Sequence, residues 1–205
     1  MSVPSAPPNK RPRVEEEKSS VVTRSDIWHP DGSVVLQVGL TQFRVHSSVL
    51  SMHSPIFKDM FEMSKPDSTD PGSMVDGCPV VQLYDDPKDV ENVLRALYTQ
   101  TLLLRPQLEF PFVAALIRLG RKYVMEELWE AGVNILTTEF PDTLAGYNAR
   151  SVVQFRPIRI KWYPALQIDC LDLAKETRVL TVLPCLYYNL LAQIKVTALL
   201  SRGPR

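Results

Sequence analysis

Apolar and polar residues alternate over two neighbouring stretches of the chain. Residues 33–38 carry an apolar side chain at every second position, and residues 41–46 repeat the alternation after Gly39. A period of two is typical of half-buried strands, and two such strands around a tight turn form a hairpin. A third short strand is expected at residues 80–83, after a proline-rich loop at 64–79.

Two residue pairs mark the beginnings of helices. In Ser54-Pro55 and Asp86-Pro87, the side-chain oxygen can accept a hydrogen bond from a free backbone N–H, and proline has no N–H to leave unpaired. The helix after Asp86-Pro87 carries the clearest apolar stripe, which runs from Val90 to Tyr98 at helical spacing. Further helices are expected at residues 47–51, 54–62, 109–121, 124–138, 162–174 and 179–195.

The helix behind Ser54-Pro55 places four large apolar side chains on one face, namely Ile56, Phe57, Met60 and Phe61. We expect this face to be buried, since burial of each large apolar side chain contributes about 1.5–3 kcal/mol. An exposed binding stripe is the alternative interpretation, and core packing is favoured over it.

The order of the elements predicts the fold class. A hairpin, two helices, a strand and three helices are segregated along the chain, which favours an α+β domain over a doubly wound nucleotide-binding sheet. We therefore predict a small three-stranded sheet flanked by about five helices at residues 25–138, and a helical extension at 139–205. Residues 1–24 are rich in proline, serine and charge and have no large aromatic residue, so a disordered tail is expected there.

Composition excludes some classes of partner. The chain has 23 basic and 23 acidic residues, so its net charge gives no reason to expect bulk attraction to nucleic acid or to a membrane surface. Three cysteines without a CxxC motif and without a secretory signal indicate reduced thiols in an intracellular compartment, the cytoplasm or the nucleus. The apolar run at 179–200 is interrupted by Pro184, Asn189 and Lys195, which favours a buried or interface helix over a membrane span.

Motifs for catalysis and for cofactor binding are lacking. His29, His46 and His53 have no metal-site spacing with a second histidine or with a cysteine. The sequence contains no G-x-S-x-G, no P-loop and no G-x-G-x-x-G. We therefore expect no enzymatic activity, no metal and no cofactor. Direct contact with nucleic acid is not expected either, because no zinc finger and no basic helix is present.

A series of motifs carries a family resemblance: Asp26, Phe43-Arg44-Val45-His46, Val49-Leu50, Ser54-Pro55-Ile56-Phe57, Met60-Phe61, Asp85-Asp86-Pro87 and Leu119-Gly120-Arg121-Lys122-Tyr123-Val124-Met125. In this order and at this spacing, they resemble the BTB (POZ) domain over residues 25–138. The segment from Trp28 to Ser33, before the first strand, is similar to the BTB proteins of mushroom-forming fungi.

The resemblance implies a protein-interaction module. BTB domains form homodimers or heteromers; many act as adaptors for cullin-type ubiquitin ligases, and others recruit corepressors or tetramerise channel subunits. We therefore expect a chain that associates with itself or with other BTB proteins and recruits a client protein, as an adaptor that binds a cullin. The alternative is a nuclear transcriptional co-regulator scaffold that acts through the same domain.

The resemblance also indicates interface residues. Asp26 matches the family aspartate near the base of the dimer groove, but Ser47 stands where a basic residue commonly follows the family histidine, here His46. Because a buried unpaired carboxylate is costly, Asp26 is expected to be solvated, hydrogen-bonded by a hydroxyl such as that of Ser47, or otherwise partnered. A cap at the entry to the hairpin is the alternative role for Asp26. His46 is expected to play a structural part, and the first helix, with Leu50, is expected at the centre of a dimer interface.

Two further stretches predict binding. Met74-Val75-Asp76 is the closest match to the apolar-any-Glu triplet of cullin adaptors in this family, with Asp one methylene shorter. Lys10-Arg11-Pro12-Arg13 predicts a nuclear-import address, for which Lys10, Arg11 and Arg13 carry the charge, and a solvated tail is the alternative. The chain ends sooner after Leu183-Pro184 than the similar fungal proteins do, which leaves open a truncated product whose exposed apolar area favours self-association.

Overall fold

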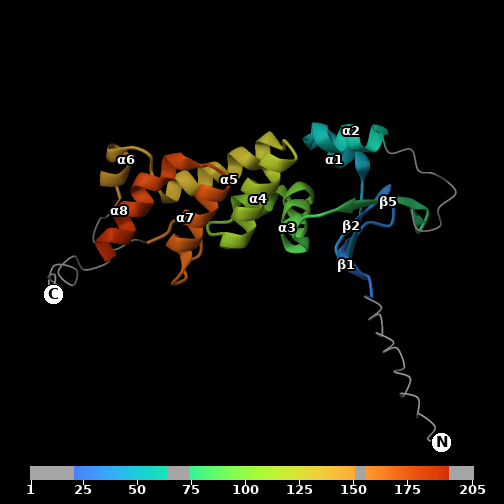
Figure 1. The fold of residues 1–205 in the computed structure, drawn as a ribbon, viewed down its shortest axis with the longest axis horizontal. Helices are drawn as coiled ribbons and strands as arrows, with labels where there is room; N and C mark the ends of the chain where they lie inside the picture. Colours follow the sequence, from blue (N-terminus) through green and yellow to red (C-terminus); the bar gives the residue numbers. More distant parts are fainter. Residues whose placement is uncertain (1–20, 64–73, 151–155, 194–205) are drawn as a thin grey trace, which may run out of the picture.

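The computed structural model describes residues 21–63, 74–150 and 156–193. Figure 1 shows an elongated molecule with the sheet and the first helices at one end, further helices in the middle and the C-terminal helices at the other end. Strands and helices are segregated as predicted, so the α+β class is confirmed.

The sheet has five strands where the sequence predicted three. Their order in the sheet is β1-β3-β2-β5-β4. Their bounds are β1 Thr23–Trp28, β2 Val34–Val38, β3 Thr41–Val45, β4 Met74–Val75 and β5 Cys78–Leu83. The predicted hairpin is the antiparallel pair β2–β3, while β1 pairs with β3 and β2 pairs with β5 in parallel.

The prediction of three strands was wrong because β1 and β4 have no strand signal of their own. In β1 a single side chain, Ile27, is buried, so no apolar alternation is visible in the sequence. β4 has two residues and is held to β5 by a turn at Asp76 and Gly77, which both have positive φ. β1 begins at Thr23, inside the stretch expected to be a tail, and residues 1–20 lie outside the described part.

The predicted helices are present in the predicted order, but the helix expected from residue 179 begins at Leu183, and a short helix at 144–148 was not predicted. The helices are α1 Ser47–His53, α2 Pro55–Met63, α3 Pro87–Tyr98, α4 Phe110–Lys122, α5 Glu126–Glu139, α6 Leu144–Asn148, α7 Leu166–Glu176 and α8 Leu183–Gln193, with short 3-10 turns η2 Gln100–Leu104 and η3 Leu180–Val182. α7 begins four residues after the predicted start at 162, since Pro164 disfavours helix for the residue before it. α5 begins after Val124, whose φ of 53° is outside the helical region.

Both predicted helix starts are confirmed. Asp86 accepts hydrogen bonds from the backbone N–H groups of Lys88 and Asp89, at 2.7 and 3.3 Å. Ser54 accepts from the N–H of Phe57 at 3.1 Å, and its hydroxyl donates to the carbonyl of Tyr123 at 2.6 Å. Ser54 is fully buried, and its two hydrogen bonds join the start of α2 to the end of α4.

The apolar face of α2 lies against the core, with one exception. Phe57 is buried and its ring stacks on Tyr123 at 4.5 Å between centroids, while Met60 and Phe61 are partly buried against the same core. This favours core packing over an exposed binding stripe. Ile56 is 39% exposed, so the prediction that all four residues share a buried face was wrong for it.

Two hydrophobic cores share α4. One lies between the sheet and α1 to α5, and the other lies between α4, α5 and the C-terminal helices. Leu116 and Leu119 belong to the first core, whereas Val113 and Ile117 belong to the second. The sequence predicted that this helix lies deep in the domain, because its apolar residues cover more than one face, and the structure confirms it.

A buried carboxylate attaches the C-terminal segment to α5. Glu139, at the end of α5, is 1% exposed and accepts hydrogen bonds from the consecutive backbone N–H groups of Ile158, Arg159 and Ile160. The guanidinium of Arg150 donates to the same carboxylate at 3.3 Å. The charged group is therefore satisfied within the chain, and it places Ile160 in the second core.

Candidate functional site

The junction of β3 and α1 is built around His46. Its backbone N–H donates to the Tyr98 hydroxyl at 2.9 Å, and the same hydroxyl lies within hydrogen-bond distance of Nδ1 of the His46 ring, also at 2.9 Å. The other ring nitrogen, Nε2, lies 3.2 Å from a carboxylate oxygen of Asp31. His46 thus connects the strand, the helix and α3, as expected of a structural residue, and the hydrogen bond from His46 lowers the pKa of Asp31.

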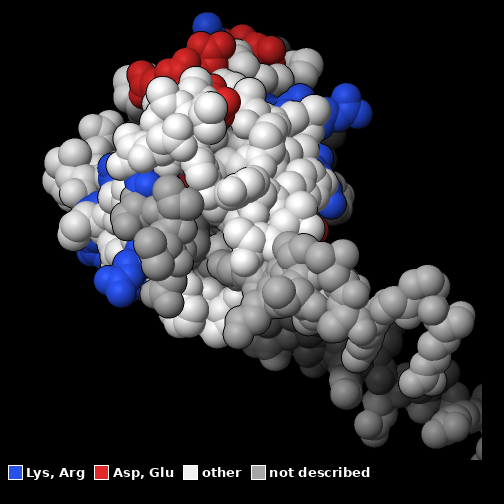
Figure 2. Space-filling view, turned by 90° about the vertical axis from the view of Figure 1, so that its left-hand side faces the viewer, with Lys and Arg blue, Asp and Glu red and all other residues white. Residues whose placement is uncertain are grey.

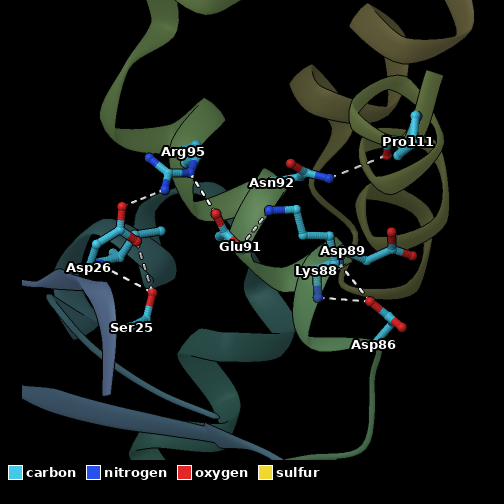
Figure 3. Close-up of polar contacts among 10 residues, drawn as sticks. Ser25, Asp26, Asp86, Lys88, Asp89, Glu91, Asn92, Arg95 and Pro111 are labelled. Carbon is cyan, nitrogen blue, oxygen red and sulfur yellow. Dashed lines mark hydrogen bonds and ion pairs between the residues drawn. The ribbon is translucent and has the colours of Figure 1, made fainter. Parts of the chain in front are cut away.

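Asp26 is partnered by α3 and not by α1. The Arg95 guanidinium lies 2.6 Å from one carboxylate oxygen, and the Ser25 hydroxyl donates to the other at 3.1 Å (Figure 3). The carboxylate remains 68% exposed, and the hydrogen bond from Arg95 lowers its pKa. The prediction that the Ser47 hydroxyl bonds to Asp26 was wrong, because Ser47 bonds to Ser33 at 2.9 Å.

Arg95 therefore supplies the positive charge that the sequence did not place beside Asp26. It also donates to Glu91, one helical turn earlier, at 2.9 Å, and Glu91 accepts in turn from Lys88 at 2.9 Å (Figure 3). The spacing of four residues makes Glu91 and Arg95 neighbours on one face of α3, but Asp26 is 69 residues from Arg95 and no local pattern connects them.

Leu50 cannot contact a partner directly in this arrangement. It is 1% exposed and lies in the core of its own chain, so its assignment to the interface surface is corrected. The exposed large apolar side chain of α1 is instead Met52, at 74%. Residues two positions apart lie on nearly opposite sides of a helix. Leu50 therefore faces the core, whereas Met52 faces the solvent.

The triplet Met74-Val75-Asp76 lies in β4 and the turn that follows it. Met74 is 41% exposed, and Asp76 forms an ion pair with Arg24 of β1 at 3.0 Å. The triplet is thus part of the sheet edge, although the sequence placed it in a loop. The cluster of Lys10, Arg11 and Arg13 lies outside the described residues.

A groove lies between the end of α1 and the beginning of α5. Its volume is about 360 Å³, and its lining residues are Met52, His53, Pro55, Val124, Met125, Glu126, Glu127 and Leu128. Met52 and Val124 are the exposed apolar side chains in this groove, and His53 lies 3.4 Å from Glu127. The sequence reasoning missed the groove because Val124 was expected inside a helix, and its positive φ has no signal in the sequence.

A second exposed apolar region lies on the C-terminal helices. Leu144 of α6 and Tyr188 and Leu191 of α8 are 73%, 57% and 58% exposed. Figure 2, which views the molecule from this end, shows a largely uncharged face with acidic side chains along its upper rim and basic side chains at its flanks.

Metal-ligating side chains and thiols are scattered in the part of the chain that the structure describes. Within residues 21–63, 74–150 and 156–193, no group of three His, Cys, Asp or Glu side chains is placed to hold a metal ion. Cys78, Cys170 and Cys185 are unpaired and buried, and burial raises the pKa of the Cys170 and Cys185 thiols. Among the described helices, none is long and apolar enough to cross a membrane.

The fold and these contacts define an α+β scaffold whose polar side chains hold its own elements together. Residues 32–139 match the family model of the BTB/POZ domain, which covers more than half of the chain. The chain therefore belongs to the BTB/POZ domain family, a class of protein-interaction modules, as the sequence motifs predicted.

Solved structures similar to this chain include a BTB domain from zebrafish. The BTB domain of zebrafish PATZ1 is similar at a TM-score of 0.39 and 19% sequence identity, covering 52% of this chain and 75% of the other. No curated protein matches the chain.

Proposed function

We propose that this chain is an adaptor that self-associates through α1 and recruits partner proteins. The observation that carries the proposal is the groove between α1 and α5, in which Met52 and Val124 expose apolar surface between charged neighbours. Exposed large apolar side chains at a formed groove mark protein contact surfaces, because they gain most from being covered.

A homodimer centred on α1 and β3 is the expected state, with a standard interface of roughly 1,600 Å² in total. Light scattering over a wide concentration range tests it. Met52→Glu places a charge in the interface and is expected to shift the chain toward monomer. Met63→Glu, at the equally exposed end of α2, is the matched control and is expected to leave association unchanged. A strict monomer at tens of micromolar, before any substitution, would contradict the proposal.

Within the adaptor role, we propose a cullin as one partner. Met74-Val75-Asp76 supports this, since the exposed side chain of Met74 precedes an acidic residue by two positions. The ion pair between Asp76 and Arg24 is half exposed, and pairs of this kind contribute little, so a partner can compete for the carboxylate. A pull-down with a cullin amino-terminal domain tests this role, with Met74→Ala as the weakened variant. A clean negative for the unaltered chain removes the cullin.

The second candidate function is a nuclear co-regulator scaffold that uses the same domain. It is favoured by the basic cluster at Lys10, Arg11 and Arg13. Alanine at all three positions should move the protein out of the nucleus; an unchanged distribution removes the support for this candidate. The resemblance of residues 28–33 to fungal BTB proteins makes fungal cells our choice for affinity purification of partners.

A further inference from the structure

We propose that a second groove, between α3 and the segment of residues 102–112, binds an extended acidic segment of a partner protein. Its volume is about 430 Å³. The lining residues are Lys88, Asn92, Arg95, Leu102, Arg105, Gln107, Leu108, Glu109, Pro111, Phe112 and Lys161. The groove would be a second contact surface of the proposed adaptor. It rests on the proposed function, because it requires that the chain recruits a partner protein.

The charges around the groove are predominantly positive. Four lining residues are cations, Lys88, Arg95, Arg105 and Lys161, and one is a carboxylate, Glu109. Asp26 and Glu91 pair with Arg95 from outside the lining, which leaves an excess of one positive charge in the group. A segment that carries carboxylates therefore finds a complementary field there.

The ion pairs already present do not block such a ligand. Lys88 pairs with Glu91, and its side chain is 66% exposed; Lys161 pairs with Glu109, and both side chains are more than half exposed. Exposed pairs of this kind contribute little, so their cations can be shared with a ligand at small cost. Arg105 is an exposed lining residue, so its guanidinium is accessible for bidentate contact with a carboxylate of the ligand.

The groove is held open by its own walls. Leu108 donates to the carbonyl of Arg159 and accepts from the N–H of Lys161, both at 2.8 Å. The Arg159 guanidinium donates to the carbonyl of Leu103 at 2.9 Å, which fixes η2 against this segment. Two walls that are fixed before binding lower the entropy cost of association.

The spacing of the cations favours a peptide over a single small anion. Lys88 and Arg95 are seven residues apart on α3, which corresponds to roughly 10 Å along the helix axis. That distance equals about three residues of an extended chain. Arg105 and Lys161 lie on the opposite wall, so carboxylates along an extended segment can meet cations on both sides. Asn92, from α3, donates to the carbonyl of Pro111 (Figure 3), and both are lining residues.

Fluorescence anisotropy of the full chain with a labelled Glu-Leu-Glu-Ser-Glu-Leu peptide tests the proposal. We expect binding that weakens with salt, and about tenfold weaker binding for the peptide with glutamine at the acidic positions. Arg105→Gln and Lys161→Gln should each weaken binding by about the same factor. Lys58→Gln is the control and should have no effect, because Lys58 is exposed on α2 and is not a lining residue of this groove. Equal binding of both peptides, or no effect of Arg105→Gln, would overturn the proposal.

Two further variants separate the possible outcomes. Met52→Glu should leave peptide affinity unchanged even where it abolishes self-association, so failure of the dimer and failure of this groove can be told apart. Glutamine at Glu15, Glu16 and Glu17, the acidic run of the chain itself, should also leave affinity unchanged. A rise of about tenfold would mean that the chain's own segment fills the groove, and the partner segment would be the wrong occupant.

Discussion

Replacement of Glu139 by glutamine should destabilise the C-terminal half of the molecule. The carboxylate accepts hydrogen bonds from three consecutive backbone N–H groups, those of residues 158–160, and from Arg150. Glutamine has nearly the same size, but its NH₂ group is a donor and cannot accept from those amides. At least one buried donor then faces another donor.

The size of the effect follows from the burial of the site. The Glu139 side chain is 0% exposed, so water cannot replace the lost partners. Hydrogen bonds to a charged acceptor contribute about 1.5–3 kcal/mol each, and disruption of a buried charged pair costs about 3–5 kcal/mol. We expect Glu139→Gln to lower the free energy of unfolding by about 3–5 kcal/mol, because glutamine still offers one acceptor oxygen.

Urea denaturation followed by circular dichroism measures this loss, and native-state hydrogen exchange locates it. The amides of residues 158–160 should exchange faster in Glu139→Gln, whereas amides of the sheet should change less, because they belong to the other core.

Glu130→Gln is the matched control. Glu130 is exposed on the same helix, so its replacement should change the free energy of unfolding by less than about 0.5 kcal/mol. If Glu139→Gln unfolded at the same urea concentration as the unaltered chain, with unchanged exchange at 158–160, the argument that this carboxylate holds the extension would be refuted.

Three other substitutions test the fold. Ser54→Ala should lower stability by about 2–4 kcal/mol in chemical denaturation, since it removes a helix cap and leaves a buried carbonyl unpaired; Ser48→Ala, exposed on α1, should have little effect. Gly132→Ala should cost about 1–3 kcal/mol, because a Cβ would lie 2.7 Å from an Ile117 side-chain carbon; a stabilised variant would contradict the close helix packing. The pKa of Asp31 is lowered in the folded state, so its contribution to stability is present above the ordinary pKa of about 4 and is lost as the pH falls toward the lower, folded value. Asp31→Asn should therefore make the denaturation midpoint less dependent on pH between about 5 and 3, and an unchanged dependence would contradict the contact with His46.

The sequence predicted those parts of the fold that depend on neighbouring residues. The alternation in β2 and β3 and the caps at Ser54 and Asp86 are local patterns, and the structure has all of them. β1 could not be predicted from alternation, because its polar residues pair with β3 through the backbone and bury a single side chain.

The contacts of the candidate site were less accessible to sequence reasoning. The family resemblance pointed to Asp26 and His46, but their partners Arg95 and Tyr98 are 69 and 52 residues away in the chain. Glu139 was assigned to the boundary of the extension, and nothing in its neighbourhood indicates that three backbone amides will surround it. Such contacts depend on how the elements pack, and a single sequence records that only indirectly.

The position of β1 has a consequence for synthesis of the chain. This strand is synthesised before its partners, because Thr23 pairs with Thr41 and Asp26 meets its cation 69 residues later. At a translation rate of about 5–20 residues per second, the nascent strand waits roughly 3–14 s for Arg95. Until Arg95 is made, β1 can pair with β3 but lacks its contact with α3.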